Sequence, residues 1–219
     1  MAITILPSGR NAREILWSPV MQKDRSSREK AIEGAERLFR KQGYAATGLT
    51  EILEESGAPK GSFYFHFPEG KQQLAHEVLL AYGSRVETSL RWLASQHQGD
   101  PSGFVRSLCR GIAEEMKASD WTLGCAAQNL SNELAPVDPG IAELIASIFS
   151  SWIAVVADAI RPAYPSRTVA EQRATSLIAS LEGARSLARA MRSSGAFEAV
   201  LDLTLVELGS KSKRRLRSR

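Results

Sequence analysis

The residues best suited to chemistry in this 219-residue chain gather between Leu49 and Lys71, in the stretch LTEILEESGAPKGSFYFHFPEGK. A helix that begins near Pro59 turns its hydrogen-bonding side chains outward in two pairs, each pair four residues apart. These side chains are Lys60, Ser62, Tyr64 and His66. Such groups suit phosphates and base edges. Gly61 has no side chain, so the backbone there can approach the wall of a groove closely. Recognition of a nucleic acid is therefore one of two interpretations of this pattern.

The chain lacks the residue patterns of common enzymes. Its three histidines, His66, His76 and His97, fall in no metal-binding frame, and Cys109 and Cys125 have no metal-type spacing. No nucleophile elbow and no phosphate-binding glycine loop are present. We therefore expect no catalytic residue, no metal and no cofactor. An enzyme remains a rival interpretation, because a single sequence does not show which side chains meet in space.

Short helices must hold this surface in place. Ser26 and Glu29 form a capping box that starts a first helix, and Gly43 ends that helix in a left-handed turn. Thr47 is the candidate N-cap of a second helix, which Gly57 ends. Helix, glycine-bearing turn and helix in this order form the helix-turn-helix arrangement.

The aromatic residues give the third helix an inner side. Phe63 and Phe67 are four residues apart, so they lie on one side and face the first two helices. The alternative is a small helical hairpin whose aromatic side chains merely fill a miniature core. The pattern alone leaves both interpretations open.

The rest of the chain also reads as helices. Nothing alternates with period two for long enough to predict a strand, so we expect an all-α fold. The expected helices cover residues 72–95, 101–118, 124–134, 139–160, 167–192 and 196–208. The apolar run 141–160 is interrupted by acids and serines, which suits a buried core helix better than a membrane span. We expect a cytoplasmic protein with reduced thiols.

Charge is distributed unevenly along the chain. Residues 77–210 are net acidic, whereas the last nine residues, KSKRRLRSR, carry six positive charges. We interpret residues 211–219 as a solvated basic tail in preference to a nucleic-acid contact, and residues 1–25 as a mobile extension. Residues 26–76 hold seven acidic and seven basic side chains, so DNA binding must depend on local placement.

One continuous motif resembles a known family. The stretch GYAATGLTEILEESGAPKGSFYFHFPEGKQQL is similar to the DNA-binding signature of TetR-family transcriptional regulators. The loop HFPEGK and the pair Gly124–Cys125 resemble the LmrA/YxaF-type branch. The resemblance implies a three-helix helix-turn-helix domain over residues 26–71 and a helical effector-binding and dimerisation domain over residues 72–210.

The resemblance also implies roles for single residues. The implied DNA contacts are Thr47 and Tyr64 to phosphates, Lys60, Gly61 and Ser62 along the major groove, and His66 near the backbone. Lys71 would hold a phosphate and couple the two domains. The implied function is a ligand-responsive dimeric regulator, usually a repressor, whose partners are operator DNA, a small effector and a second copy of the chain. A helical binding module with a vestigial helix-turn-helix is a third interpretation.

The effector pocket is the least determined part of the sequence. Bulky side chains of the middle helices are candidate lining residues, with one polar anchor: Trp92, Phe104, Met116, Trp121, Phe149 and Trp152, and Asn129. Aromatic residues at helical spacing more often belong to a core, which is the alternative. The uncharged segment GCAAQNL favours an apolar effector.

Two apolar helices near the C-terminus are candidates for a dimer interface. The candidate residues are Ala170, Ala174, Leu177, Ile178, Leu181, Ala188 and Met191 on one helix, and Phe197 and Leu201 on the next. Packing within one chain would produce the same pattern. We favour a dimer because helix-turn-helix proteins usually read paired half-sites.

Overall fold

The structure is a computed structural model that describes residues 26–216, with side chains described as far as residue 209. The expected extension, residues 1–25, lies outside the described residues, as does the end of the expected basic tail. The described helices are α2 (Ser27–Gln42), α3 (Leu49–Ser56), α4 (Lys60–His66), α5 (Lys71–Gln96), α6 (Pro101–Ala118), α7 (Ala126–Leu134), α8 (Pro139–Ile160), η1 (Arg161–Ala163), α9 (Arg167–Met191) and α10 (Gly195–Leu216). Within this range there is no β-strand, so the all-α prediction is confirmed.

Helix α2 begins and ends where predicted, but Gly43, with ψ −179°, does not adopt the predicted left-handed helical turn. The Glu29 amide donates to Ser26 Oγ at 3.2 Å, and the Ser26 amide donates to Glu29 Oε2 at 2.9 Å, which completes the capping box. Gly43 follows α2 with φ 86°, and Gly57 follows α3 in the left-handed region with φ 63°. These signals are local, so neighbouring residues suffice to predict them.

The predicted N-cap of α3 is wrong. The cap is Gly48, which makes no side-chain hydrogen bond. Thr47 is fully buried instead, and its hydroxyl donates to the Gly43 carbonyl at 2.7 Å. Thr47 therefore stabilises the turn after α2 and does not cap α3.

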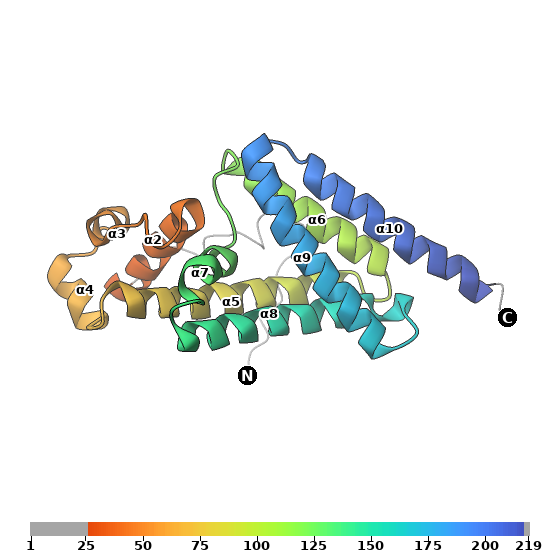
Figure 1. The fold of residues 1–219 in the computed structure, drawn as a ribbon, viewed down its shortest axis with the longest axis horizontal. Coiled ribbons are helices and arrows are strands. Elements are labelled where there is room, and N and C mark those ends of the chain that lie inside the picture. The colour runs from red at the N-terminus through yellow and green to blue at the C-terminus, as the bar shows by residue number, and fades with distance from the viewer. Residues whose placement is uncertain (1–25, 217–219) are drawn as a thin grey trace.

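The helices divide into a small group at one end and a larger group around a long central helix (Figure 1). Helices α2, α3 and α4 form the helix-turn-helix unit, in which α2 packs against both others. The 26-residue α5 begins beside this unit and continues along α8. Helix α9 packs against α8 and α10, and α6 packs against α10.

Aromatic side chains hold the helix-turn-helix unit together. Phe63 of α4 and Phe67, which caps the C-terminal end of α4, are 1% and 0% exposed, with ring centroids 5.1 Å apart. Phe39 of α2 and Ile52 of α3 are also fully buried. The prediction that Phe63 and Phe67 face inward is confirmed.

Helices α5 and α8 approach each other closely at Gly83. A Cβ at this position would lie 2.8 Å from Ile148 Cγ1, so only glycine fits. The close approach lets Trp152 of α8 donate from Nε1 to the Gly83 carbonyl at 3.0 Å. By length and composition alone the segment Pro139–Ala163 is apolar enough to cross a membrane, with a mean hydropathy of 1.8. Core helices pass the same test, and α8 packs between α5 and α9.

The predicted dimer stripe lies mainly inside the single chain. Most of its residues are at most 9% exposed: Ala170, Ala174, Leu177, Leu181, Ala188, Phe197 and Leu201. They pack α9 and α10 against each other and against the rest of the chain, so this placement does not support their predicted role in a dimer interface. Ile178 is half-buried, and only Met191 of the set is largely exposed, at 69%.

Candidate nucleic-acid interface and interdomain joint

Helix α4 presents side chains from two successive turns to solvent. Lys60 and Gly61 are exposed in its first turn, and Tyr64 and Phe65 are 47% and 82% exposed one turn later. Lys60, a predicted hydrogen-bond donor, and Gly61, predicted to allow close approach, are therefore both accessible. This face is free to contact an external partner.

The remaining predicted contacts of α4 lie at the edge of that face. Ser62 and His66 are half-buried, and the His66 ring packs edge-on against Phe65 with centroids 5.1 Å apart. Phe65 itself was missed by sequence reasoning, which looked for hydrogen-bond donors. Its position four residues after Gly61 was the available signal.

Two glutamates of α3 are held by α2. Arg37 Nε donates to Glu55 Oε1 at 2.7 Å, and Gln42 Nε2 donates to Glu51 Oε2 at 2.8 Å. The Arg37–Glu55 ion pair offsets one negative charge of α3, and the neutral Gln42 only hydrogen-bonds Glu51. The helix-turn-helix segment has equal numbers of acidic and basic side chains, so holding its glutamates away from the DNA reduces their repulsion of the phosphates.

Lys71 fastens the α2–α3 loop to α5. Its Nζ donates to the Tyr44 carbonyl at 2.9 Å and to the Thr47 carbonyl at 2.8 Å, and it lies 4.0 Å from the centroid of the Tyr44 ring. Burial lowers the pKa of the Lys71 ammonium. Lys71 thus joins the two helical groups directly. Its ammonium is occupied by these carbonyls and Thr47 is buried, so the structure does not support the predicted phosphate contacts of either residue.

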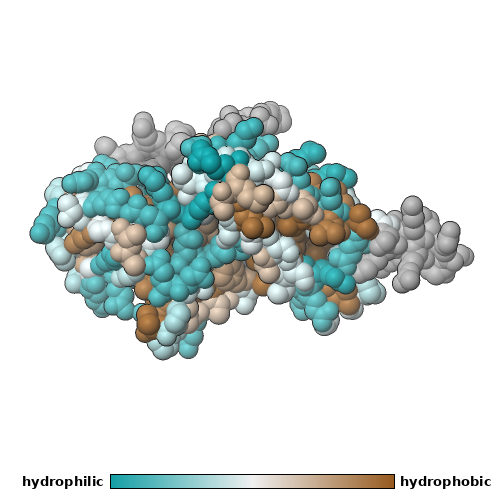
Figure 2. Space-filling model, turned by 45° about the horizontal axis from the view of Figure 1, so that its top comes forward, coloured by the Kyte–Doolittle hydropathy of each residue, from teal (hydrophilic) through white to brown (hydrophobic). Residues whose placement is uncertain are grey.

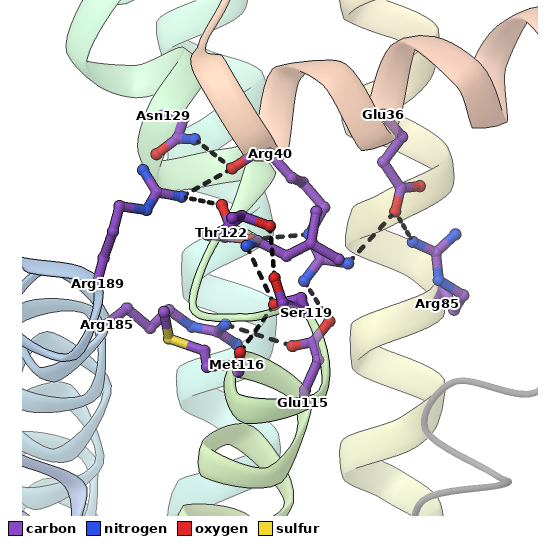
Figure 3. Close-up of polar contacts among 12 residues, drawn as sticks. Glu36, Arg40, Arg85, Glu115, Met116, Ser119, Thr122, Asn129, Arg185 and Arg189 are labelled. Atoms are coloured by element: carbon purple, nitrogen blue, oxygen red, sulfur yellow. Dashed lines mark hydrogen bonds and ion pairs between the residues drawn. The ribbon is translucent and has the colours of Figure 1, made fainter. Parts of the chain in front are cut away.

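The C-terminal end of α2 is anchored by a buried ion cluster (Figure 3). Arg40 is 3% exposed, donates from Nε to the Gly124 carbonyl at 2.7 Å and pairs with Glu115 of α6. The other oxygen of Glu115 lies 3.4 Å from Nη1 of Arg185 on α9. Glu115 therefore bridges the helix-turn-helix unit and α9 of the larger group.

The backbone of α2 is held at the same place. The Arg40 carbonyl accepts bonds from the Gly124 amide at 2.9 Å, Asn129 Nδ2 at 3.1 Å and Arg189 Nη2 at 2.9 Å (Figure 3). Asn129 Nδ2 also donates to the Phe39 carbonyl at 2.9 Å. Since its amide is already bonded to α2, the prediction that Asn129 anchors an effector is not supported.

Helix α7 holds the loop after α2 through one carboxylate. Glu133 accepts from the Tyr44 amide at 2.7 Å and from the Ala45 amide at 2.6 Å. Together with the α2 contacts, these bonds form what we call the interdomain joint: Arg40, Glu115, Asn129, Glu133, Arg185 and Arg189.

The predicted pocket residues do not converge on one cavity. Phe104 and Met116 are fully buried, Trp152 is 3% exposed and bonded to α5, and Trp92 and Trp121 are half-buried against the core. Phe149 lines a groove of about 260 Å³ between α7, α8 and α9. These side chains mainly form the core, which was the alternative interpretation.

Other cavities border α6. One of about 370 Å³ lies between α6 and α10, where Cys109 and Phe197 line it. Another, of about 60 Å³, is lined by Tyr82, Leu108 and Arg185. Both reach side chains of the helix that carries Glu115.

Comparison with known proteins identifies the family. Residues 31–78 match the family described as "Bacterial regulatory proteins, tetR family", and residues 101–202 match "Transcriptional regulator LmrA/YxaF-like, C-terminal domain". The chain is 37% identical over 131 residues to the uncharacterized HTH-type transcriptional regulator YxaF of Bacillus subtilis, covering 60% of this chain and 68% of that protein. It is 31% identical over 157 residues to the HTH-type transcriptional regulator LmrA of the same organism, covering 72% and 83%.

Solved structures share the fold. The regulatory protein TetR from Rhodobacter sphaeroides superposes with a TM-score of 0.70 at 21% identity, covering 81% of this chain and 96% of that chain. The reduced form of E. coli NemR superposes with a TM-score of 0.69 at 22% identity, covering 81% and 95%. The helix-turn-helix geometry and the matched residues agree: the chain belongs to the TetR family of DNA-binding transcriptional regulators, with a C-terminal part of the LmrA/YxaF-like type.

Proposed function

We propose that this protein is a dimeric, ligand-responsive transcriptional repressor that binds its operator through α4. The exposed face of α4 carries the proposal. Lys60, Gly61 and Tyr64 are presented to solvent, while Phe63 and Phe67 fix the helix on the core of the unit. Contacts to phosphates position such a helix, and contacts to base edges specify the sequence.

Binding to the DNA upstream of the protein's own gene tests the proposal, because regulators of this family commonly control neighbouring genes. The full chain is titrated against that DNA and against a scrambled duplex of the same length and composition, at moderate salt. We expect clear preference for the upstream DNA. Equal affinity for the two duplexes would contradict sequence-specific binding.

The proposed dimer surface is the outward side of α9 and α10. Four large apolar residues there are exposed: Leu187, Met191, Leu203 and Val206. Hydrophobic surface gathers over the part of the molecule formed by these helices (Figure 2). We expect Leu203→Glu to convert the dimer to a monomer in sedimentation experiments, whereas Leu80→Glu, on α5, leaves it dimeric. A dimeric Leu203→Glu protein would contradict this surface.

The proposed effector is small and largely apolar, and it acts through α6. Cavities of about 370 and 60 Å³ both border this helix. A molecule that occupies or widens either cavity shifts α6 relative to α5 or α10. Because Glu115 on α6 holds Arg40 of α2, the shift changes the orientation of the helix-turn-helix unit. The dimer then loses the half-site spacing of about 34–36 Å, or a multiple of it, that its operator requires.

Reciprocal titrations test the effector mechanism. Candidate apolar compounds are titrated against the protein with and without the upstream DNA. Linkage requires that the DNA weaken effector binding by the same factor as the effector weakens DNA binding, a coupling on the order of 1–3 kcal/mol. Compounds that bind the protein tightly, and with the same affinity whether or not the DNA is present, would contradict the mechanism. In this role the protein acts in the cytoplasm, with DNA and effector as its partners.

A further inference from the structure

Phe65 is an exposed aromatic side chain on the helix proposed to enter the groove. Among the described large hydrophobic residues that are exposed, Phe65 has the largest exposed fraction, 82%. Single exposed hydrophobic residues are common on protein surfaces. Phe65, however, adjoins the half-exposed Tyr64 and follows the exposed Gly61 by about one helical turn.

Gly61, one turn earlier, is not explained by the packing of the chain. A Cβ at Gly34 would lie 3.2 Å from Ser56 Cβ, so the contact between α2 and α3 favours glycine there. A Cβ at Gly61 would meet nothing within 4 Å, and Gly61 is not among the residues with positive φ. Glycine in a helix costs roughly 1 kcal/mol relative to alanine. Neither packing within the chain nor backbone conformation therefore explains why glycine, and not alanine, occupies position 61.

The two residues are neighbours on the helix surface. Positions 61 and 65 are four residues apart, and helical side chains lean toward the N-terminus of their helix. Phe65 therefore follows Gly61 by about one turn on this side of α4, and no atom of the chain lies within 4 Å of the place where a Cβ of residue 61 would be. The result is an apolar surface with open space beside it.

We propose that Phe65 is a specificity-determining residue that reads a thymine 5-methyl group in the major groove, and that Gly61 provides the clearance for it. The thymine methyl is the apolar group that base pairs present in the major groove. Lys60 and Tyr64 flank the contact and hold the adjoining phosphates or bases. This inference rests on the proposed function, since it assumes that α4 enters the groove.

Uracil scanning tests the contact. A high-affinity duplex is selected from random sequence with the full chain, and each thymine is replaced singly by deoxyuridine, which removes only the methyl group. For the wild type we expect one or more thymines at which the replacement weakens binding roughly fourfold, as expected for one buried methyl group. Phe65→Ala should bind thymine and uracil duplexes equally at those positions, and Phe65→Leu should keep part of the preference.

Gly61→Ala tests the clearance separately. Because alanine favours the helix and meets no neighbour within the chain, the melting temperature should stay the same or rise. Affinity for the selected duplex should fall, so stability and binding move in opposite directions. A Gly61→Ala protein that binds as tightly as the wild type would overturn the clearance role.

The outcomes separate this inference from the proposed function. Failure of the wild type to select any sequence would overturn both. Specific binding in which uracil replacement affects wild type and Phe65→Ala alike would overturn the role of Phe65 alone. Circular dichroism and thermal melting of each variant confirm that the exposed substitutions leave the fold intact.

Discussion

The face of α4 and the C-terminal end of α2 belong to the same small unit but use their polar groups differently. On α4, Lys60 and Tyr64 reach solvent. At the end of α2, Arg40 is buried, and both its guanidinium and its carbonyl are bonded to the larger helical group. One surface is available to an external partner, whereas the other is occupied by the rest of the chain.

Because of this difference, substitutions on the α4 face and in the interdomain joint should affect different properties, namely DNA affinity and folding stability. A side chain on the α4 face makes few internal contacts, so its removal weakens binding and leaves folding almost unchanged. A side chain in the interdomain joint has buried partners that stay behind when it is removed. Substitutions at the two places should therefore have different effects on stability and on DNA affinity.

Glu115→Gln should have the largest effect. The substitution leaves Arg40 and Arg185 buried without their shared carboxylate, and breaking a buried ion pair costs about 3–5 kcal/mol. The free energy of unfolding is measured by urea denaturation. Glu114→Gln, at the exposed neighbouring position, is the matched control and should change little. Similar stability of the two variants would show that the joint does not hold the units together.

Lys71→Met should have an intermediate effect on stability. The two hydrogen bonds from Nζ to the α2–α3 loop disappear, at a cost of about 1.5–3 kcal/mol for charged donors. Lys60→Met removes an exposed lysine eleven residues earlier in the chain and should leave the unfolding free energy nearly constant. An unchanged Lys71→Met protein would show that the loop is held by other contacts.

Tyr64→Ala and Lys60→Ala should affect binding and not folding. Each substitution on the α4 face should weaken operator binding by about 1–3 kcal/mol, while helicity and dimer mass stay as in the wild type. Arg106→Ala, which removes an exposed cation of α6, controls for a general loss of positive charge. If Lys60→Ala and Arg106→Ala weaken binding equally, Lys60 contributes through bulk charge and not through its place on the α4 face.

Deletion of residues 211–219 should have the smallest effect. The tail carries six positive charges, but α10 ends at the opposite end of the molecule from α4 (Figure 1). We expect the slope of affinity against salt concentration to stay constant, because the tail releases no counterions from the DNA. A clearly shallower slope would place the tail on the DNA.

Much of the fold follows from local signals in the sequence. The capping box of Ser26 and Glu29 and the glycine turns at Gly43 and Gly57 involve residues close together in the chain. Helical periodicity likewise predicts the inward side of α4, because Phe63 and Phe67 lie one turn apart. Such features are determined by neighbouring residues, so they can be predicted from the sequence.

The errors concern partners that are distant in the chain. Asn129 looks like a free polar anchor until α2, 90 residues away, supplies the Phe39 carbonyl that it binds. The stripe from Ala170 to Ala188 predicts that α9 is buried, but periodicity does not say whether the covering helix belongs to the same chain. Thr47 is a residue type that often caps helices, yet its hydroxyl donates to the carbonyl of Gly43 instead.

The most direct test of α4 as the DNA-binding surface is hydroxyl-radical labelling of the protein with and without its selected duplex. Tyr64 and Phe65 are exposed in the free protein, and their rings react readily with the radical. We expect DNA to protect both rings and to leave the reactivity of Val137, an exposed residue between α7 and α8, unchanged. Unprotected Tyr64 and Phe65 in a saturated complex would contradict the assignment of α4 as the DNA-binding surface.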